Sequence, residues 1–170
     1  MKTSFALSAL VLGSLAILIA GCSPAAEPEP APSPSHVQVS AKTGEELAGE
    51  GWAVTVNSAQ FDADETVAAA NEFNPAAEDG EQYLLVNLTI ERTTSPAASP
   101  LAIQVKVAAE DDTFHEAAAV APEQLRLLEP VSPGTPITGN LAYLIPATAA
   151  QADVQIHMIG SGSTFVVPIT

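Results

Sequence analysis

The chain has 170 residues and a mass of 17.4 kDa, which suits one domain with terminal extensions. It carries 20 acidic residues against 5 basic ones, so its formal net charge is -15. This balance excludes nucleic acid as a direct partner, because proteins bind phosphate backbones with clustered Lys and Arg. The single cysteine excludes an intramolecular disulfide and any cysteine-rich zinc module.

The first 22 residues have the pattern of an export signal rather than of a folded element. Lys2 supplies a positive charge, and residues 5–20 form an uncharged apolar run. This run is shorter than the roughly 20 apolar residues that a transmembrane helix needs. It ends in IAGC at residues 19–22, which resembles the lipobox of bacterial lipoproteins. The resemblance implies a diacylglycerol on the Cys22 thiol and cleavage between Gly21 and Cys22.

Residues 1–21 are therefore predicted to be a lipoprotein signal peptide. The alternatives are a secretory signal with an incidental cysteine, or an uncleaved anchor. Two acyl chains, at about 0.8 kcal/mol for each buried methylene, hold a protein stably where one chain is marginal. The predicted location is the bacterial cell membrane, with the protein facing the extracytoplasmic side. Whether the Cys22 amino group is also acylated, for example with palmitate, the sequence leaves open.

Residues 22–50 are predicted to be a flexible tether rich in Pro, Ala and Glu. Five of the chain's 14 prolines lie within residues 23–35. Such a segment has no core to bury and favours an extended polyproline conformation. At about 3.1 Å per residue, it reaches roughly 40 Å. A proline-rich ligand for another domain is the competing interpretation, and residues 36–50 either hold a first short strand or remain loose.

The pattern of apolar residues changes to a period of two from residue 51 onwards, where six runs alternate apolar with polar side chains. Alternation over four to eight residues is typical of half-buried strands, and Gly, Pro, Asn and Asp separate these runs. The pattern predicts an antiparallel β-sandwich of six or seven short strands over residues 51–170. Short helical segments are expected at residues 64–71 and 122–128. The runs are 52–56, 83–90, 103–107, 141–145, 154–158 and 165–169.

Several of these segments resemble the exported domains of the domain-of-unknown-function 4352 family. The motifs are GWAVTV at 51–56, GEQYLLVNLTI at 80–90, AEDDTF at 109–114, LLEPVSPG at 127–134 and GNLAYLIP at 139–146. The resemblance implies a telokin-like, immunoglobulin-type sandwich. Members of that family are commonly lipoproteins or secreted antigens without an agreed biochemical activity, so the resemblance transfers no catalytic residue.

Acidic residues dominate the stretch between Lys42 and Arg92, which has eleven acids and no basic residue. Asp62, Asp64 and Glu65 are the candidate metal ligands within it, although the glycine and the distant glutamate of an EF-hand loop are missing. The alternative is a solvated acidic surface that keeps a tethered protein soluble and away from anionic lipid.

The remaining candidate residues favour structural roles. The histidines at 36, 115 and 157 have no partner at metal-ligand spacing, so surface positions are predicted. The GSGS motif at 160–163 lacks the strand-to-helix context of a nucleophile elbow and is expected to be a hairpin turn. Trp52, the only tryptophan, is expected in the core rather than against a ligand.

The predicted function is a non-enzymatic, membrane-tethered binding or accessory module. Its only expected cofactor is the covalent diacylglycerol, and its expected partners are the membrane and an envelope or extracellular protein that contacts residues 61–80. The alternative is a small metal-dependent enzyme or cation-binding domain that uses residues 61–81, with His115 and Glu116. A third hypothesis is a structural or immunogenic envelope protein without a ligand, which the sequence does not separate from the first.

Overall fold

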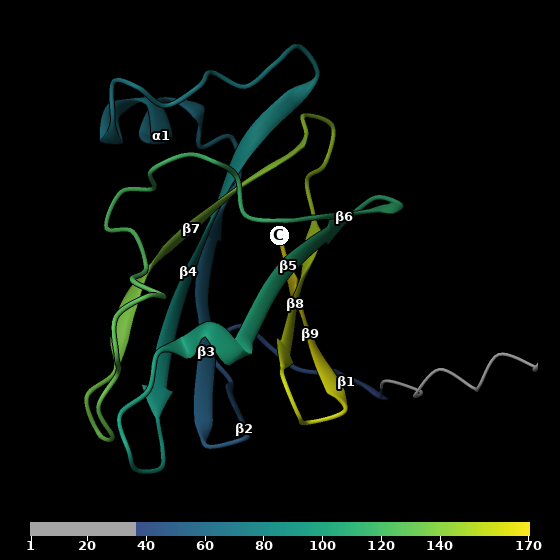
Figure 1. Cartoon of the computed structure of the whole chain (residues 1–170). Coiled ribbons are helices and arrows are strands. Elements are labelled where there is room, and N and C mark those ends of the chain that lie inside the picture. The colour runs from purple at the N-terminus through teal and green to yellow at the C-terminus, as the bar shows by residue number, and fades with distance from the viewer. Residues whose placement is uncertain (1–36) are drawn as a thin grey trace, which may run out of the picture. The chain divides into compact units, whose positions relative to one another are not determined.

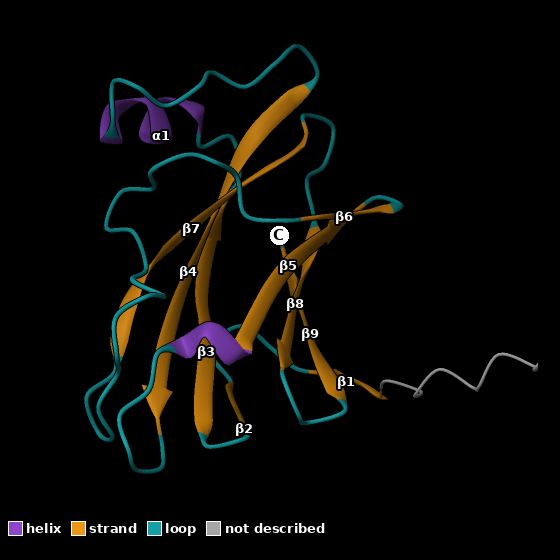
Figure 2. Cartoon of the chain, in the orientation of Figure 1, coloured by secondary structure: helices purple, strands orange, loops and turns teal. Residues whose placement is uncertain are grey.

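The computed structural model describes residues 37–170. The predicted signal peptide, the lipid-attachment residue Cys22 and residues 23–36 of the predicted tether lie outside the described residues. Two sheets lie face to face in the described part, with one core between them (Figures 1 and 2). The domain is therefore an all-β, immunoglobulin-like sandwich. The alternation of the sequence predicts the sandwich, and the family resemblance implies its immunoglobulin type.

One sheet has five strands in the order β1-β9-β8-β5-β6. The first strand pairs parallel with β9, and every other pairing in this sheet is antiparallel. The strands are β1 (Val37–Ser40), β5 (Ile103–Ala109), β6 (Asp112–Phe114), β8 (Ala152–Met158) and β9 (Ser163–Ile169).

The other sheet has four antiparallel strands in the order β2-β3-β4-β7. Helix α1 (Asp64–Ala70) connects β3 to β4, and the 3-10 turn η1 (Pro100–Ala102) precedes β5. All six predicted strands and the helix at 64–71 are confirmed. The strands of this sheet are β2 (Glu46–Gly49), β3 (Trp52–Gln60), β4 (Glu81–Arg92) and β7 (Ile137–Pro146).

Burial of apolar side chains from both inner faces stabilises the sandwich. Trp52 is only 3% exposed and belongs to this core, so its predicted structural role is confirmed. The Arg92 guanidinium lies 4.8 Å from the Trp52 ring centroid, a cation–π contact that covers the edge of the core. The innermost side chains include Val54, Val56, Leu84, Leu88, Ile90, Val107, Val154, Ile156, Met158 and Val167.

The sandwich starts earlier in the chain than the expected boundary at residue 51. Strand β1 pairs with β9, and β2 pairs with β3, so residues 37–50 belong to the folded domain rather than to the tether. Leu47 is 3% exposed and packs in the core. Strand β1 is the short first strand that the sequence left as one of two alternatives. Strand β2, with four residues, and β6, with three, show too little alternation to be recognised. The domain thus has nine strands within the described residues.

The expected helical segment at 122–128 is wrong, because these residues form turns and extended backbone. The backbone polar groups of the segment are bound to strand β7 instead of to one another. The Asn140 amide donates to the Glu123 carbonyl (3.0 Å), and the Leu125 amide donates to the Asn140 carbonyl (3.0 Å). A helix would need these same groups for its own hydrogen bonds.

Gln82 on β4 is the buried polar residue of the described core, at 3% exposure. Its side-chain oxygen accepts from the Asp62 backbone amide (2.8 Å). Its side-chain nitrogen donates to the carbonyls of Pro146 (3.1 Å) and Ala149 (2.9 Å). One amide side chain therefore holds the start of the β3–β4 connection and the β7–β8 turn against β4.

We expect Gln82→Met to lower the free energy of unfolding by about 2–4 kcal/mol, because the change keeps the volume but leaves buried backbone groups without partners. Chemical denaturation monitored by Trp52 fluorescence measures the loss. The matched control is Gln104→Met on the exposed face of β5, for which we expect a change within about 0.5 kcal/mol. Equal effects of the two substitutions would contradict this account of Gln82.

Candidate functional site

The connection between β6 and β7, residues 115–136, runs along the outer edge of the four-stranded sheet (Figure 1). We call it the β6–β7 segment. Its Ala117 amide donates to the Ala142 carbonyl (2.7 Å), in addition to the two hydrogen bonds to Asn140 described above. An unpaired strand edge invites association with other chains, so this segment protects the edge of β7.

Two residues of β7 allow the segment to lie this close. A Cβ atom at Gly139 would come within 2.6 Å of the Glu123 carbonyl oxygen and within 2.7 Å of the Leu125 amide nitrogen. Only glycine therefore accommodates the backbone of the segment at this point. Asn140 donates a side-chain hydrogen bond to the Pro122 carbonyl (2.6 Å), while its side-chain oxygen accepts from Asn87 (2.8 Å).

Between this segment and η1 lies a groove of about 920 Å³, which we call the β7 groove. Three apolar side chains that line it are exposed to solvent: Leu128 at 80%, Leu101 at 62% and Val120 at 40%. Leu125, which is buried, also lines the groove. A hydrogen bond from the Ser99 hydroxyl to the Leu128 carbonyl (3.1 Å) joins the η1 side to the β6–β7 segment.

Charged residues of the β7 groove are mostly acidic. Glu116, Glu123 and Glu129 line it, together with Arg126. The Arg126 guanidinium forms an ion pair with Glu129 at 3.2 Å, and both side chains remain largely exposed. Partial burial raises the pKa of the Glu116 carboxyl, and a hydrogen bond with the Gln124 side chain opposes that rise.

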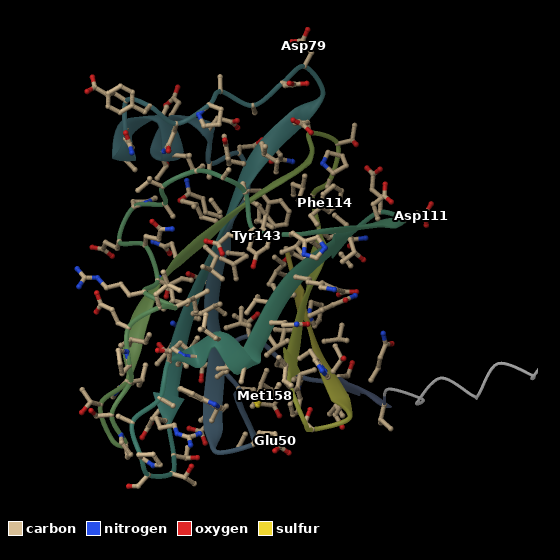
Figure 3. All side chains as sticks on the ribbon, viewed as in Figure 1. Glu50, Asp79, Asp111, Phe114, Tyr143 and Met158 are labelled. Carbon is tan, nitrogen blue, oxygen red and sulfur yellow. The ribbon has the colours of Figure 1, made fainter. Side chains whose placement is uncertain are left out.

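Tyr143 connects the groove wall to the core, because Glu116 pairs with it through an isolated β-bridge. Its hydroxyl donates to the Val105 carbonyl of the facing sheet (3.3 Å). Burial raises the pKa of this hydroxyl, and the negative charge of Glu116 raises it further. Tyr143 belongs to the core cluster, and Phe114 of β6 packs against the same cluster (Figure 3).

The candidate metal ligands lie at the start of α1. Asp62 is in the turn before the helix, and Asp64 and Glu65 occupy its first turn. The helix dipole stabilises carboxylates at this end of a helix. Within residues 37–170, no group of three or more His, Cys, Asp or Glu side chains is arranged to hold a metal ion. Cation binding by residues 61–81 therefore stays a prediction, which metal analysis of the purified protein tests.

Acidic side chains are spread over the domain. Asp79 lies in a turn at one end of the sandwich and Glu50 at the opposite end (Figure 3). Asp111 lies in a further turn, between β5 and β6. Burial raises the pKa of Tyr83, and the neighbouring charges of Asp64 and Glu81 add to this effect.

Of the described histidines, His115 lies next to the groove in the sequence, whereas His157 and the GSGS motif do not line it. His115 is exposed, as expected, and it directly precedes the groove residue Glu116. His157 is on the outer face of β8, with its Nδ1 atom 3.0 Å from the Ser163 carbonyl oxygen. Residues 160–163 lie at the β8–β9 turn, which confirms the expected hairpin, and His36 lies outside the described residues.

Asn74 connects residues 61–81 to the β7 groove through side-chain hydrogen bonds. The Asn74 side chain donates to the carbonyls of Val67 (2.6 Å) and Val120 (2.9 Å), and it accepts from the Val120 amide (2.8 Å). Sequence reasoning missed the groove, although apolar residues in a loop were a usable signal, such as the two leucines of RLLEP at 126–130. In the described part of the chain, no helix is long and apolar enough to cross a membrane.

Two solved structures share the fold. An uncharacterized β-sandwich protein from Clostridium difficile 630 is 13% identical, with a TM-score of 0.56 over 84% of this chain and 100% of that one. A "putative lipoprotein (ycdA)" from Bacillus subtilis subsp. subtilis str. 168 is 12% identical, with a TM-score of 0.52 over 73% of this chain and 38% of that one. Such low identity shows the fold alone. No curated protein matches the chain.

A family model described as "Domain of unknown function (DUF4352)" matches residues 41–164. The match begins before residue 51 and includes β2, in agreement with the earlier start of the sandwich. It extends through the β6–β7 segment to the start of β9 and so covers most of the chain. The chain therefore belongs to the DUF4352 family.

Proposed function

We propose that this protein is an extracytoplasmic lipoprotein whose sandwich is a non-enzymatic binding module, and that the β7 groove is its binding site. The observation that carries the proposal is the exposure of Leu101 and Leu128 on one groove. Contiguous exposed apolar side chains rimmed by polar ones are typical of interaction sites. The groove volume of about 920 Å³ is within the range of ligand sites.

The position of the groove supports the same function. It is built from loops on a rigid sandwich, and loops positioned by a rigid scaffold commonly carry binding residues. Gly139 and Asn140 hold the β6–β7 segment against β7, so the groove is preformed, which reduces the entropy lost on binding.

The amino-terminal sequence supports the membrane attachment. The lipobox-like IAGC at 19–22 ends in the only cysteine, and the following proline-rich residues 23–35 reach roughly 40 Å when extended. A tether of this reach separates a binding domain from the bilayer surface. The envelope or the extracellular space is then where the partner is found.

We expect Cys22→Ala to abolish incorporation of an alkyne-labelled fatty acid and to shift the protein from the membrane fraction to the soluble fraction or to an unprocessed precursor. The reason is that the chain has no other thiol for lipidation. Fractionation, with mass spectrometry of the intact chain, measures both effects. Ser35→Ala is the control and should keep the label. A Cys22→Ala protein of mature mass that stays membrane-bound would contradict the proposed anchor.

Photo-crosslinking in the native envelope tests the groove as a binding site. Replacement of Leu128 by p-benzoylphenylalanine should give a discrete adduct, because this side chain is 80% exposed in the groove. The matched control is the same replacement at Ile159, which is 53% exposed near the β8–β9 turn. The Leu128 adduct should weaken when Leu101→Ser is added. Identical adducts from positions 128 and 159 would rule out the groove as the specific site.

A further inference from the structure

We infer that the β7 groove binds a cationic, apolar peptide segment of another protein, an inference that rests on the proposed function and adds the class of ligand. The apolar part of the argument comes from Leu101, Val120 and Leu128. These side chains belong to two separate segments, η1 and the β6–β7 segment. A ligand that covers all of them presents several aliphatic side chains along its length, as a peptide does.

The charge of the groove determines the polar character of the ligand. Three carboxylates line it, from Glu116, Glu123 and Glu129. Arg126, the one basic residue among the described lining residues, is already paired with Glu129 at 3.2 Å. The net charge of the groove lining is therefore negative. Lys or Arg side chains of the inferred ligand would neutralise it. Because screening weakens charges beyond about 8 Å at physiological salt, the carboxylates that line the groove act on a bound ligand more strongly than distant ones do.

Charge also argues against the other occupants. A second copy of this chain brings a further net charge of -15, so the two surfaces repel each other. The proline-rich residues 23–35 of the same chain contain Glu27 and Glu29 but no Lys or Arg. Anionic lipid headgroups and phosphates are repelled in the same way. A basic segment of a different protein has the complementary charge.

Fluorescence anisotropy of a labelled seven-residue probe tests the inference. The probe has the sequence Leu-Lys-Gly-Leu-Lys-Gly-Leu, and two matched probes carry Glu in place of Lys or Ser in place of Leu. Each is titrated with the full chain in neutral detergent, and binding to empty micelles is subtracted. The lysine–leucine probe should bind the wild type best, and its affinity should fall as salt is raised.

Substitutions in the protein separate apolar recognition from charge. Leu128→Ser should weaken the lysine–leucine probe about tenfold, because an exposed aliphatic contact is lost without a change in the core. The double substitution Glu123→Gln with Glu129→Gln should weaken it about threefold and reduce the salt dependence. The controls are Ile159→Ser, and Glu45→Gln with Glu46→Gln on the β2 side, which should change the affinity by less than about twofold.

The outcomes distinguish the ligand class from the proposed function. If Leu128→Ser weakens binding but the glutamate probe binds as well as the lysine probe, the groove remains the site and the cationic class is overturned. If no probe binds while crosslinking from position 128 still gives its specific adduct, the cationic peptide is overturned as the ligand class, and the proposed binding function remains. If all variants bind the lysine probe equally, the attraction is diffuse and the inference fails. Loss of both probe binding and adduct removes the proposed binding function as well.

Discussion

The pairing of β4 with β7 is the interaction on which the rest of the domain depends. Ten consecutive register pairs join the two strands, from Glu81 opposite Pro146 to Ile90 opposite Ile137. Strand β4 is apolar on both faces over residues 83–86 because both faces are covered. Its inner face packs on the five-stranded sheet, and its outer face packs under α1 and residues 117–121. Burial on both sides stabilises a core that has no disulfide.

The edge of the same sheet creates the candidate site. Strand β7 needs a partner for its outer backbone groups, and the β6–β7 segment supplies one without becoming a regular strand. Hydrogen bonds to Asn140 and the space left by Gly139 place this segment. Leu128 lies beyond the residues of the segment that bind β7; its carbonyl accepts from Ser99, and its side chain remains exposed. The segment that covers the edge of β7 thus also forms one wall of an apolar groove beside η1.

Electrostatics is the basis of the selectivity that we propose for the groove. The whole chain is acidic, and its negative side chains are distributed from Glu50 at one end of the sandwich to Asp79 at the other. A distributed charge of one sign keeps a domain soluble and attracts oppositely charged molecules at long range. The groove adds a local pattern, in which carboxylates flank exposed leucines. Long-range attraction and local apolar contact together favour a basic, apolar ligand.

The sequence by itself determined the acidic balance and six of the strands, because the period-two pattern of runs such as 154–158 is a local property of the chain. It also indicated α1, whereas the export-type leader stays a prediction. The sequence left β1 as one of two alternatives and did not reveal β2 or β6, since three or four residues with few buried positions carry too little pattern. The expected helix at 122–128 failed because β7, distant in sequence, competes for the same backbone groups. Only the tertiary structure decided that Leu101 and Leu128 line one groove, because their proximity depends on the pairing of β7 with residues 115–125 and of Ala98 with Val131.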